Sequence, residues 1–312
     1  MATDIPSIEL IVGPLIIGAL LTYFFMGVYM VQLQRYVSLS KRNGEKRMVH
    51  VIVALTTILE LLQLVFITHN LYQVVVVHFA DISGILRKSP WTGGMMPALN
   101  GLVAFLVQIF RIWRIRTFMK SVWGTEFLTP IIFLLSFSQC GAAIAATMLF
   151  MTSGRDGARL VVLKPAVVTW ISLTIACDTL VALSIVIPLL KYKRTSQFSR
   201  SREIIDAVVL KTVENGTIIV LFSIPYLIVF IKYPNTMIAP AFEHVLSRLY
   251  ANVLLATLNG RQRLRETGDG MSKADTTPWV LDGNGFAFAT QSDSTSQSTT
   301  IQPPGEKSAP SV

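Results

Sequence analysis

Four ionisable side chains lie deep inside long apolar stretches of the chain: Glu60, Asp178, Glu214 and Arg248. Each lies about three helical turns from the nearest basic loop, or roughly 15–18 Å at the helical rise per residue. Charge at this depth of a bilayer costs at least about 2.5–3.5 kcal/mol, so such residues face protein and pair with one another. We therefore expect Arg248 to pair with Glu60, with Asp178 or Glu214 as the alternative partner.

Such a layer of charge is consistent with two kinds of chemistry. Its pairs hold helices in register, or they line a site for a ligand, an ion or a proton. Three stripes of mostly polar residues at helical spacing extend the layer. They are Thr56, Glu60, Gln63, Ile67 and Asn70; Asn100, Ala104, Gln108 and Arg111; and His244, Arg248 and Asn252. Lipid cannot satisfy polar groups, so these stripes should face other helices. The predicted ligand-binding or structural polar core is Glu60, Gln63, Asn70, Asn100, Asp178, Glu214, Arg248 and Asn252.

Seven apolar stretches must position these residues. The chain is 52% hydrophobic and 14% charged, with a mean hydropathy of +0.56, whereas soluble domains carry about 25% charged residues. Apolar blocks longer than about 18 residues are typical of membrane spans. The expected fold is an all-α, integral membrane seven-helix bundle over residues 10–260. Its spans are expected at about 10–33, 48–77, 95–115, 127–151, 165–190, 204–231 and 237–259.

The basic residues predict how the bundle is oriented. Lys and Arg cluster after the first, third, fifth and seventh stretches and are scarcer in the other loops. Cytoplasmic loops carry the excess of Lys and Arg, so residues 1–9 are expected outside and the C-terminus in the cytoplasm. The net charge of +9 thus belongs to loops that contact anionic membrane lipids, and no nucleic-acid partner is expected.

The composition changes beyond the seventh stretch. Residues 261–312 begin with Arg261, Arg263 and Arg265 and then become rich in Ser, Thr, Gly, Gln and Pro. A segment with so few large apolar residues cannot bury enough surface to fold, which predicts a disordered cytoplasmic tail. The basic, serine-bearing loop at 191–203 lies on the same side of the membrane. Both segments are candidates for contact with a cytoplasmic signalling partner.

The sequence contains no pattern typical of catalysis or of a bound cofactor. Its four histidines include no HxxxH spacing, and neither a Ser-His-Asp arrangement nor a Gly-rich phosphate loop is present. We therefore expect no enzyme, no catalytic residues, no metal and no cofactor.

Several segments resemble a large family of uncharacterised seven-span membrane proteins of mushroom-forming fungi, which share a C-terminal domain of unknown function. They are Gly13-Pro14 with Gly18, Gly27-Val28 and Gln32; Thr68-His69-Asn70-Leu71-Tyr72; Cys177-Asp178-Thr179-Leu180; and the run from Leu249-Tyr250-Ala251-Asn252 to Gly260-Arg261. The family often has Thr-His-Asp where this chain has Asn70, so no acid is expected there. The resemblance covers about residues 8 to 265, with the domain of unknown function over the fifth to seventh spans. It implies fold and membrane residence, and no established activity.

Two functional classes fit these observations. The first is a receptor-like sensor with a polar intramembrane pocket for a small-molecule ligand, resident in the plasma membrane rather than an internal membrane. The second is a small-solute or proton-coupled transporter that uses the carboxylates at mid-depth. The shape of the polar site distinguishes them, because transport requires access from both faces and sensing does not.

Overall fold

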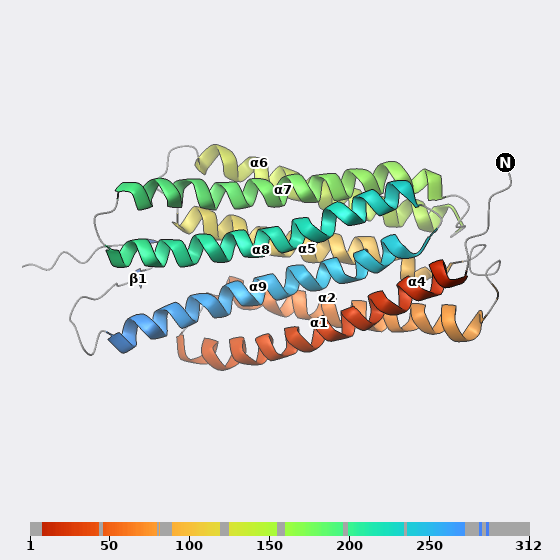
Figure 1. Cartoon of the computed structure of the whole chain (residues 1–312), viewed down its shortest axis with the longest axis horizontal. Coiled ribbons are helices and arrows are strands. Elements are labelled where there is room, and N and C mark those ends of the chain that lie inside the picture. Colours follow the sequence, from red (N-terminus) through yellow and green to blue (C-terminus); the bar gives the residue numbers. More distant parts are fainter. Residues whose placement is uncertain are drawn as a thin grey trace, which may run out of the picture.

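The computed structural model describes residues 8–43, 46–79, 81, 89–118, 125–154, 160–195, 199–233, 236–271, 281–282 and 285–286. Seven long helices run side by side along the long axis of the molecule (Figure 1). They are α1 (Ile8–Asn43), α2 (Arg47–Tyr72), α5 (Met96–Phe118), α6 (Thr125–Thr152), α7 (Leu160–Thr195), α8 (Ser199–Lys232) and α9 (Ile238–Met271).

Four short elements complete the described structure. A π-helical turn, η1 (Gln73–Val77), continues α2, and α4 (Trp91–Gly94) precedes α5. The strands β1 (Leu281–Asp282) and β2 (Gly285–Phe286) pair antiparallel, with Leu281 opposite Phe286. This small hairpin lies within the segment that the sequence predicts to be disordered.

Six of the long helices are long and apolar enough to cross a membrane: α1, α2 with η1, α4 with α5, α6, α7 and α8. Large apolar side chains such as Phe24, Phe127 and Leu134 are exposed on the outside of the bundle. Acyl chains can cover such a surface, whereas water cannot cover it without cost. The chain is thus an all-helical, multi-pass integral membrane protein with six spans of clear length and composition and one further long helix.

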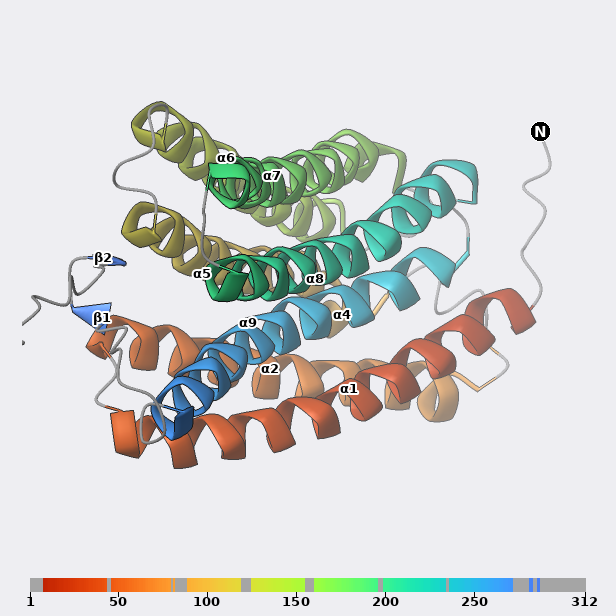
Figure 2. The same cartoon turned by 60° about the vertical axis from the view of Figure 1, so that its left-hand side comes forward.

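That further helix, α9, lies in the interior of the bundle. Every residue from 243 to 255 is buried, and the helix contacts α1, α2, α5 and α8. Figure 2 shows α9 enclosed between α1 and α2 on one side and α8 on the other. Since its neighbours shield α9 from lipid, it can carry more polar residues than an outer span and still lie at membrane depth.

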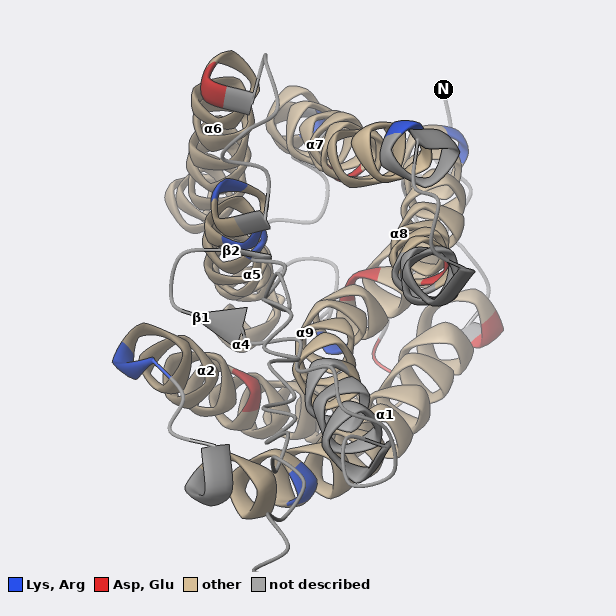
Figure 3. Ribbon diagram, turned by 90° about the vertical axis from the view of Figure 1, so that its left-hand side faces the viewer, with Lys and Arg blue, Asp and Glu red and all other residues tan. Residues whose placement is uncertain are grey.

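One end of the bundle is basic. There α1, α5, α7 and α9 end while α2, α6 and α8 begin, and Figure 3 faces this end. Basic residues at this end of the described structure include Lys46, Arg47, Arg114, Arg116 and Lys191. The described basic residues at the opposite end are Lys164 and Lys232. We call the first end the basic end.

Several helices extend beyond the predicted spans. α1 continues to Asn43, and α9 continues to Met271. The prediction that the disordered tail begins at residue 261 is therefore wrong for residues 261–271. Arg, Gln, Leu and Glu form helices readily, so α9 propagates through them even though the apolar stretch has ended. Most of the predicted tail, and residues 1–7 of the predicted N-terminal segment 1–9, lie outside the described residues.

The packing of α1 against α9 depends on one glycine. A Cβ atom added at Gly18 would lie 2.8 Å from the backbone Cα of Ala241, closer than real Cβ contacts. Gly18→Ala is expected to lower the free energy of unfolding by about 1–3 kcal/mol, because the two backbones must separate. Gly27→Ala on the same helix is the matched control, because a Cβ there meets nothing within 4 Å. Thermal unfolding of both variants in detergent measures the difference; equal midpoints would contradict the predicted close approach.

Candidate functional site: two buried ion pairs and a cavity

The first ion pair joins the central helix to α2. Arg248 of α9 forms an ion pair with Glu60 of α2, and both side chains are fully buried. Arg248 also donates from Nη1 to the backbone carbonyl of Glu60 at 2.9 Å, and Ser247 Oγ donates to Glu60 Oε1 at 2.7 Å. The predicted pairing of Arg248 with Glu60 is confirmed. It combines charge and hydrogen bonds, which a buried pair needs to offset its desolvation.

Asn252, one turn further along α9, binds the central helix to α1. Its amide nitrogen donates to the carbonyl of Phe25 at 3.1 Å, and its Oδ1 accepts from Gln32 Nε2 at 3.2 Å. Near the basic end, Asn259 Nδ2 donates to the carbonyl of Gln32 at 3.0 Å. These contacts hold α1 and α9 in register.

The second ion pair lies across α5, α7 and α9. Asp178 of α7 is fully buried and accepts from Arg111 Nη1 at 2.5 Å and from Gln108 Nε2 at 2.8 Å, both on α5. Its second oxygen accepts a short hydrogen bond from the hydroxyl of Tyr250 on α9. The guanidinium of Arg111 also lies over the ring of Tyr250, 5.8 Å from its centroid. One carboxylate thus connects three helices.

A third polar cluster lies nearer the opposite end. Glu243 of α9 is buried, and its carboxylate accepts from the amide of Asn100 on α5 at 3.4 Å and from the hydroxyl of Tyr226 on α8 at 3.5 Å. Asn100 also donates to the backbone carbonyl of Glu243 at 3.2 Å. Among the described residues, the hydrogen-bond donors that contact this acid are neutral side chains.

Several buried side chains in and beside these clusters have polar atoms without hydrogen-bond partners among the described residues. They include Gln63 of α2, at both amide atoms, and His244 of α9, at both ring nitrogens. Gln63 lies one turn from Glu60, and His244 lies one turn from Arg248, so helical spacing places both at the α2–α9 contact. An unsatisfied buried polar group costs about 1–3 kcal/mol, so this contact is a place where water or a polar ligand would be stabilised.

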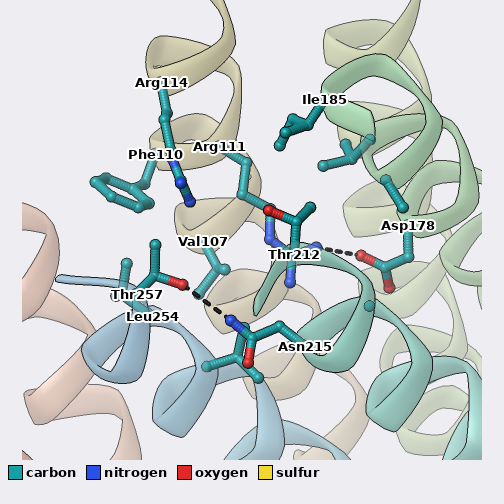
Figure 4. A pocket seen from close by; sticks show the side chains of 14 residues that line it. Val107, Phe110, Arg111, Arg114, Asp178, Ile185, Thr212, Asn215, Leu254 and Thr257 are labelled. Carbon is teal, nitrogen blue, oxygen red and sulfur yellow. Dashed lines mark hydrogen bonds and ion pairs between the residues drawn. The ribbon is translucent and has the colours of Figure 1, made fainter. Parts of the chain in front are cut away.

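A cavity lies between α5, α7, α8 and α9 in the half of the bundle toward the basic end. The space enclosed within it is about 30 Å³, and a total of about 440 Å³ is reached only when open solvent at its mouth is included. Figure 4 shows Arg111 and Arg114 entering it from α5, with Asp178 on the opposite wall. Asn215 of α8 donates to the hydroxyl of Thr257 on α9 at 3.3 Å and closes the third side. The cavity is therefore mostly apolar with a few convergent polar groups, as ligand sites usually are.

The structure brings most of the predicted polar core together around α9, but not all of it. Three of its members contact the central helix through the bonds described above: Glu60, Asp178 and Asn100. Two more, Arg248 and Asn252, lie on that helix. Gln63 is fully buried without a partner. Asn70 is buried far from Glu60, beside α4, where a Cβ added at Gly93 would lie 3.2 Å from its Oδ1.

The prediction that Glu214 belongs to this core is wrong. Its side chain is exposed, whereas its neighbour Asn215 faces the cavity. Consecutive helical residues point about 100° apart, so the two cannot face the same way.

Three polar contacts of α9 were not predicted from the sequence; they are made by Glu243, Ser247 and Tyr250. These residues follow one another at i, i+4 and i+7, so they form a second polar stripe beside the predicted stripe of His244, Arg248 and Asn252. A helix with two polar stripes at membrane depth must have protein on both sides. That double pattern is the signal that could have identified α9 as the central helix.

Fold and site together define an all-helical, multi-pass integral membrane protein with a buried polar core. Residues 174–263 match a family of unknown function (DUF6534). No curated protein and no solved structure gives a match. The matched segment covers the second half of α7, α8 and most of α9, which confirms the predicted position of a C-terminal domain of unknown function. It includes Asp178, Arg248 and Tyr250, but the family supplies no activity.

Proposed function

We propose that this protein is a receptor-like sensor of the plasma membrane with seven spans, α9 being the seventh. Its N-terminus is outside, and the basic end lies in the cytoplasm, following the excess of Lys and Arg there. The ligand is a small molecule that reaches the polar layer of Glu243, Asn100, Gln63 and His244 from outside. A plasma-membrane location follows from this role, because the ligand arrives from outside the cell.

One observation carries this proposal: the buried central helix makes polar contacts in both halves of the bundle. Glu243 binds Asn100 and Tyr226 in the outer half, and Tyr250 binds Asp178 beside the cavity. Hydrogen-bonded contacts between helices have discrete alternative arrangements, so displacement of α9 at one end can be converted into a rearrangement at the other. The 191–203 loop and the tail are then the places where a cytoplasmic signalling partner would detect it.

The test measures coupling between the two ends directly. Spin labels are placed at the basic end, on Lys46→Cys directly before α2 and on Lys191→Cys of α7. The distribution of distances between the two labels is recorded by pulsed electron paramagnetic resonance. Glu243→Leu in the outer half is expected to shift this distribution, because it removes the contacts that hold α9 against α5 and α8. The control is Lys232→Gln, a substitution of an exposed residue in the same outer half of the bundle as Glu243. An unchanged distribution in Glu243→Leu would contradict the sensor proposal.

A transporter is the second candidate, favoured by the position of Asp178 at the wall of the cavity. A carboxylate that lines a cavity and is buried at mid-depth is the kind of group that carries a coupled proton or cation. Proteoliposomes loaded with a pH-sensitive dye test this idea. A proton flux in the wild type that Asp178→Asn and Glu60→Gln abolish would favour transport over sensing, whereas a flux unaffected by both changes would remove its support.

A further inference from the structure

We propose that Glu243 is a proton-binding site: at neutral pH its carboxyl group holds a proton and, as a neutral acid, joins α9 to α5 and α8. The ligand is a proton, and the site is this one side chain with its hydrogen-bond partners Asn100 and Tyr226. The sensor proposal uses Glu243 as a contact and assigns no protonation state to it. The bound proton goes beyond that proposal and requires neither a small-molecule ligand nor coupling to the basic end.

The buried carboxyl groups outnumber the arginines paired with them. Three acidic side chains are buried in the described structure: Glu60, Asp178 and Glu243. Arg248 forms an ion pair with the first, and Arg111 forms one with the second. Among the described residues, no basic side chain forms an ion pair with Glu243. An isolated carboxylate in an apolar interior is so costly that the group takes up a proton instead.

The hydrogen bonds of Glu243 are longer than those of the paired acid Asp178. Asp178 accepts from its arginine and glutamine partners on α5 at 2.5 and 2.8 Å. Glu243 accepts from the amide of Asn100 at 3.4 Å and from the hydroxyl of Tyr226 at 3.5 Å. Hydrogen bonds with an ionised partner are shorter than those between neutral groups. The long bonds of Glu243 are therefore consistent with a neutral acid.

The titratable groups closest to Glu243 supply no counter-charge. Tyr226 contacts it through a neutral hydroxyl, and the ring of Tyr226 packs against Trp170 of α7 with the centroids 6.1 Å apart. His244 follows it on α9 and is buried, without a hydrogen-bond partner for either ring nitrogen among the described residues. Lys232, at the outer end of α8, is exposed. The carboxyl group thus lies among aromatic rings and neutral donors.

The other helices around α9 bring no free charge to this place in the described structure. The first charged residue along α5 is Arg111, which lies toward the basic end in its ion pair. On α1, Glu9 is exposed and the hydroxyl of Tyr23 bonds to α2. On α2, Glu60 is held in its own ion pair and His69 contacts α4. A proton is the cation that can neutralise Glu243 without a cavity.

Infrared spectroscopy tests for this proton directly. The carbonyl stretch of a protonated carboxylic acid lies at a higher frequency than the bands of carboxylates and backbone amides. The full chain is purified in a detergent without ester groups, and difference spectra between the wild type and each variant are recorded at neutral pH. Glu243→Gln is expected to lose a protonated-acid band. The matched control is Glu9→Gln, the same change at an exposed acid, which should keep this band.

Tyr226→Phe gives a second test in a variant that keeps the acid. The substitution removes one hydrogen bond from the carboxyl group, so the protonated-acid band should persist and shift in frequency. Tyr233→Phe changes an exposed tyrosine directly after α8 and should leave the band unchanged. This pair remains informative if Glu243→Gln does not fold.

The bound proton also links stability to pH. If the folded protein holds a proton that the unfolded chain releases, stability falls as pH rises. The amide of Glu243→Gln has no such proton, and the two proteins share all other titratable groups. The thermal midpoint of the wild type should therefore fall relative to that of Glu243→Gln between about pH 5 and about pH 8.

The proposal is supported if the protonated-acid band is lost in Glu243→Gln, kept in Glu9→Gln and shifted in Tyr226→Phe. It is overturned if the difference spectrum of Glu243→Gln shows no such band, or if the spectrum of Tyr226→Phe matches that of the wild type. Midpoints of the wild type and Glu243→Gln that change in parallel with pH would also overturn it. The spectra report the protonation of one side chain, so their failure is distinct from failure of the spin-label test of the sensor proposal.

Discussion

Arg248→Met is expected to lower the free energy of unfolding by about 3–5 kcal/mol, one of the largest effects of any single substitution in this protein. The change removes the cation but leaves Glu60 fully buried with Ser247 Oγ as its remaining side-chain donor. A buried carboxylate without a counter-charge keeps its desolvation cost and loses the attraction that offset it. The measurement is reversible unfolding of the purified protein in mixed micelles, titrated with a denaturing detergent.

Glu214→Gln is the matched control for this prediction. It also removes one charge from a helix of the bundle, but the side chain of Glu214 is exposed. An interaction at such a position contributes less than about 1 kcal/mol, so the unfolding curve should move little. Equal losses in Arg248→Met and Glu214→Gln would show that the α2–α9 pair has no special part in holding the bundle together.

Asp178→Ala is expected to have a comparably large effect, about 3–5 kcal/mol, for a different reason. This substitution removes the common acceptor of Arg111, Gln108 and Tyr250 and so affects three helices at once. Arg111 is partly exposed and can turn toward the cavity, so most of the cost arises from the buried partners Gln108 and Tyr250.

A comparison between substitutions tests whether the cost of Asp178→Ala arises from its buried hydrogen-bond partners. Asp178→Asn keeps an acceptor for the Tyr250 hydroxyl and should cost clearly less than Asp178→Ala. Tyr250→Phe removes a single hydrogen bond to a charged acceptor and should cost about 1.5–3 kcal/mol. We expect the unfolding midpoint to be lowest in Asp178→Ala, intermediate in Tyr250→Phe and Asp178→Asn, and highest in the wild type. If Asp178→Ala were as stable as the wild type, the three-helix connection through this carboxylate would be refuted.

The sequence predicts the parts of this structure that follow from the bilayer. Long apolar stretches identify the helices, and the cost of charge at depth identifies Arg248 and Glu60 as partners. The inward orientation of Gln63 and Gln108 follows from helical spacing in the same way, because each belongs to a polar stripe that lipid cannot satisfy. These predictions need only local pattern and one strong physical constraint.

The remaining features depend on which helices become neighbours, and periodicity does not encode that. Tyr250 and Glu243 point away from the stripe of Arg248, so they become recognisable as site residues only once α9 is known to be enclosed by other helices. Glu214 was misplaced because depth does not show which way a side chain points: Glu214 is exposed, whereas its neighbour Asn215 lines the cavity. The cavity likewise arises from the meeting of four helices and has no signature in any one of them.

A double-mutant cycle on Glu60 and Arg248 tests most directly whether buried ion pairs hold the helices to α9. Free energies of unfolding are measured for Glu60→Met, Arg248→Met and the combined variant, with the wild type as the fourth corner. The sum of the two single losses should exceed the loss in the combined variant by about 2–3 kcal/mol. The reason is that the double replacement leaves no unpaired charge in the interior. Additive losses, agreeing within about 0.5 kcal/mol, would contradict the account.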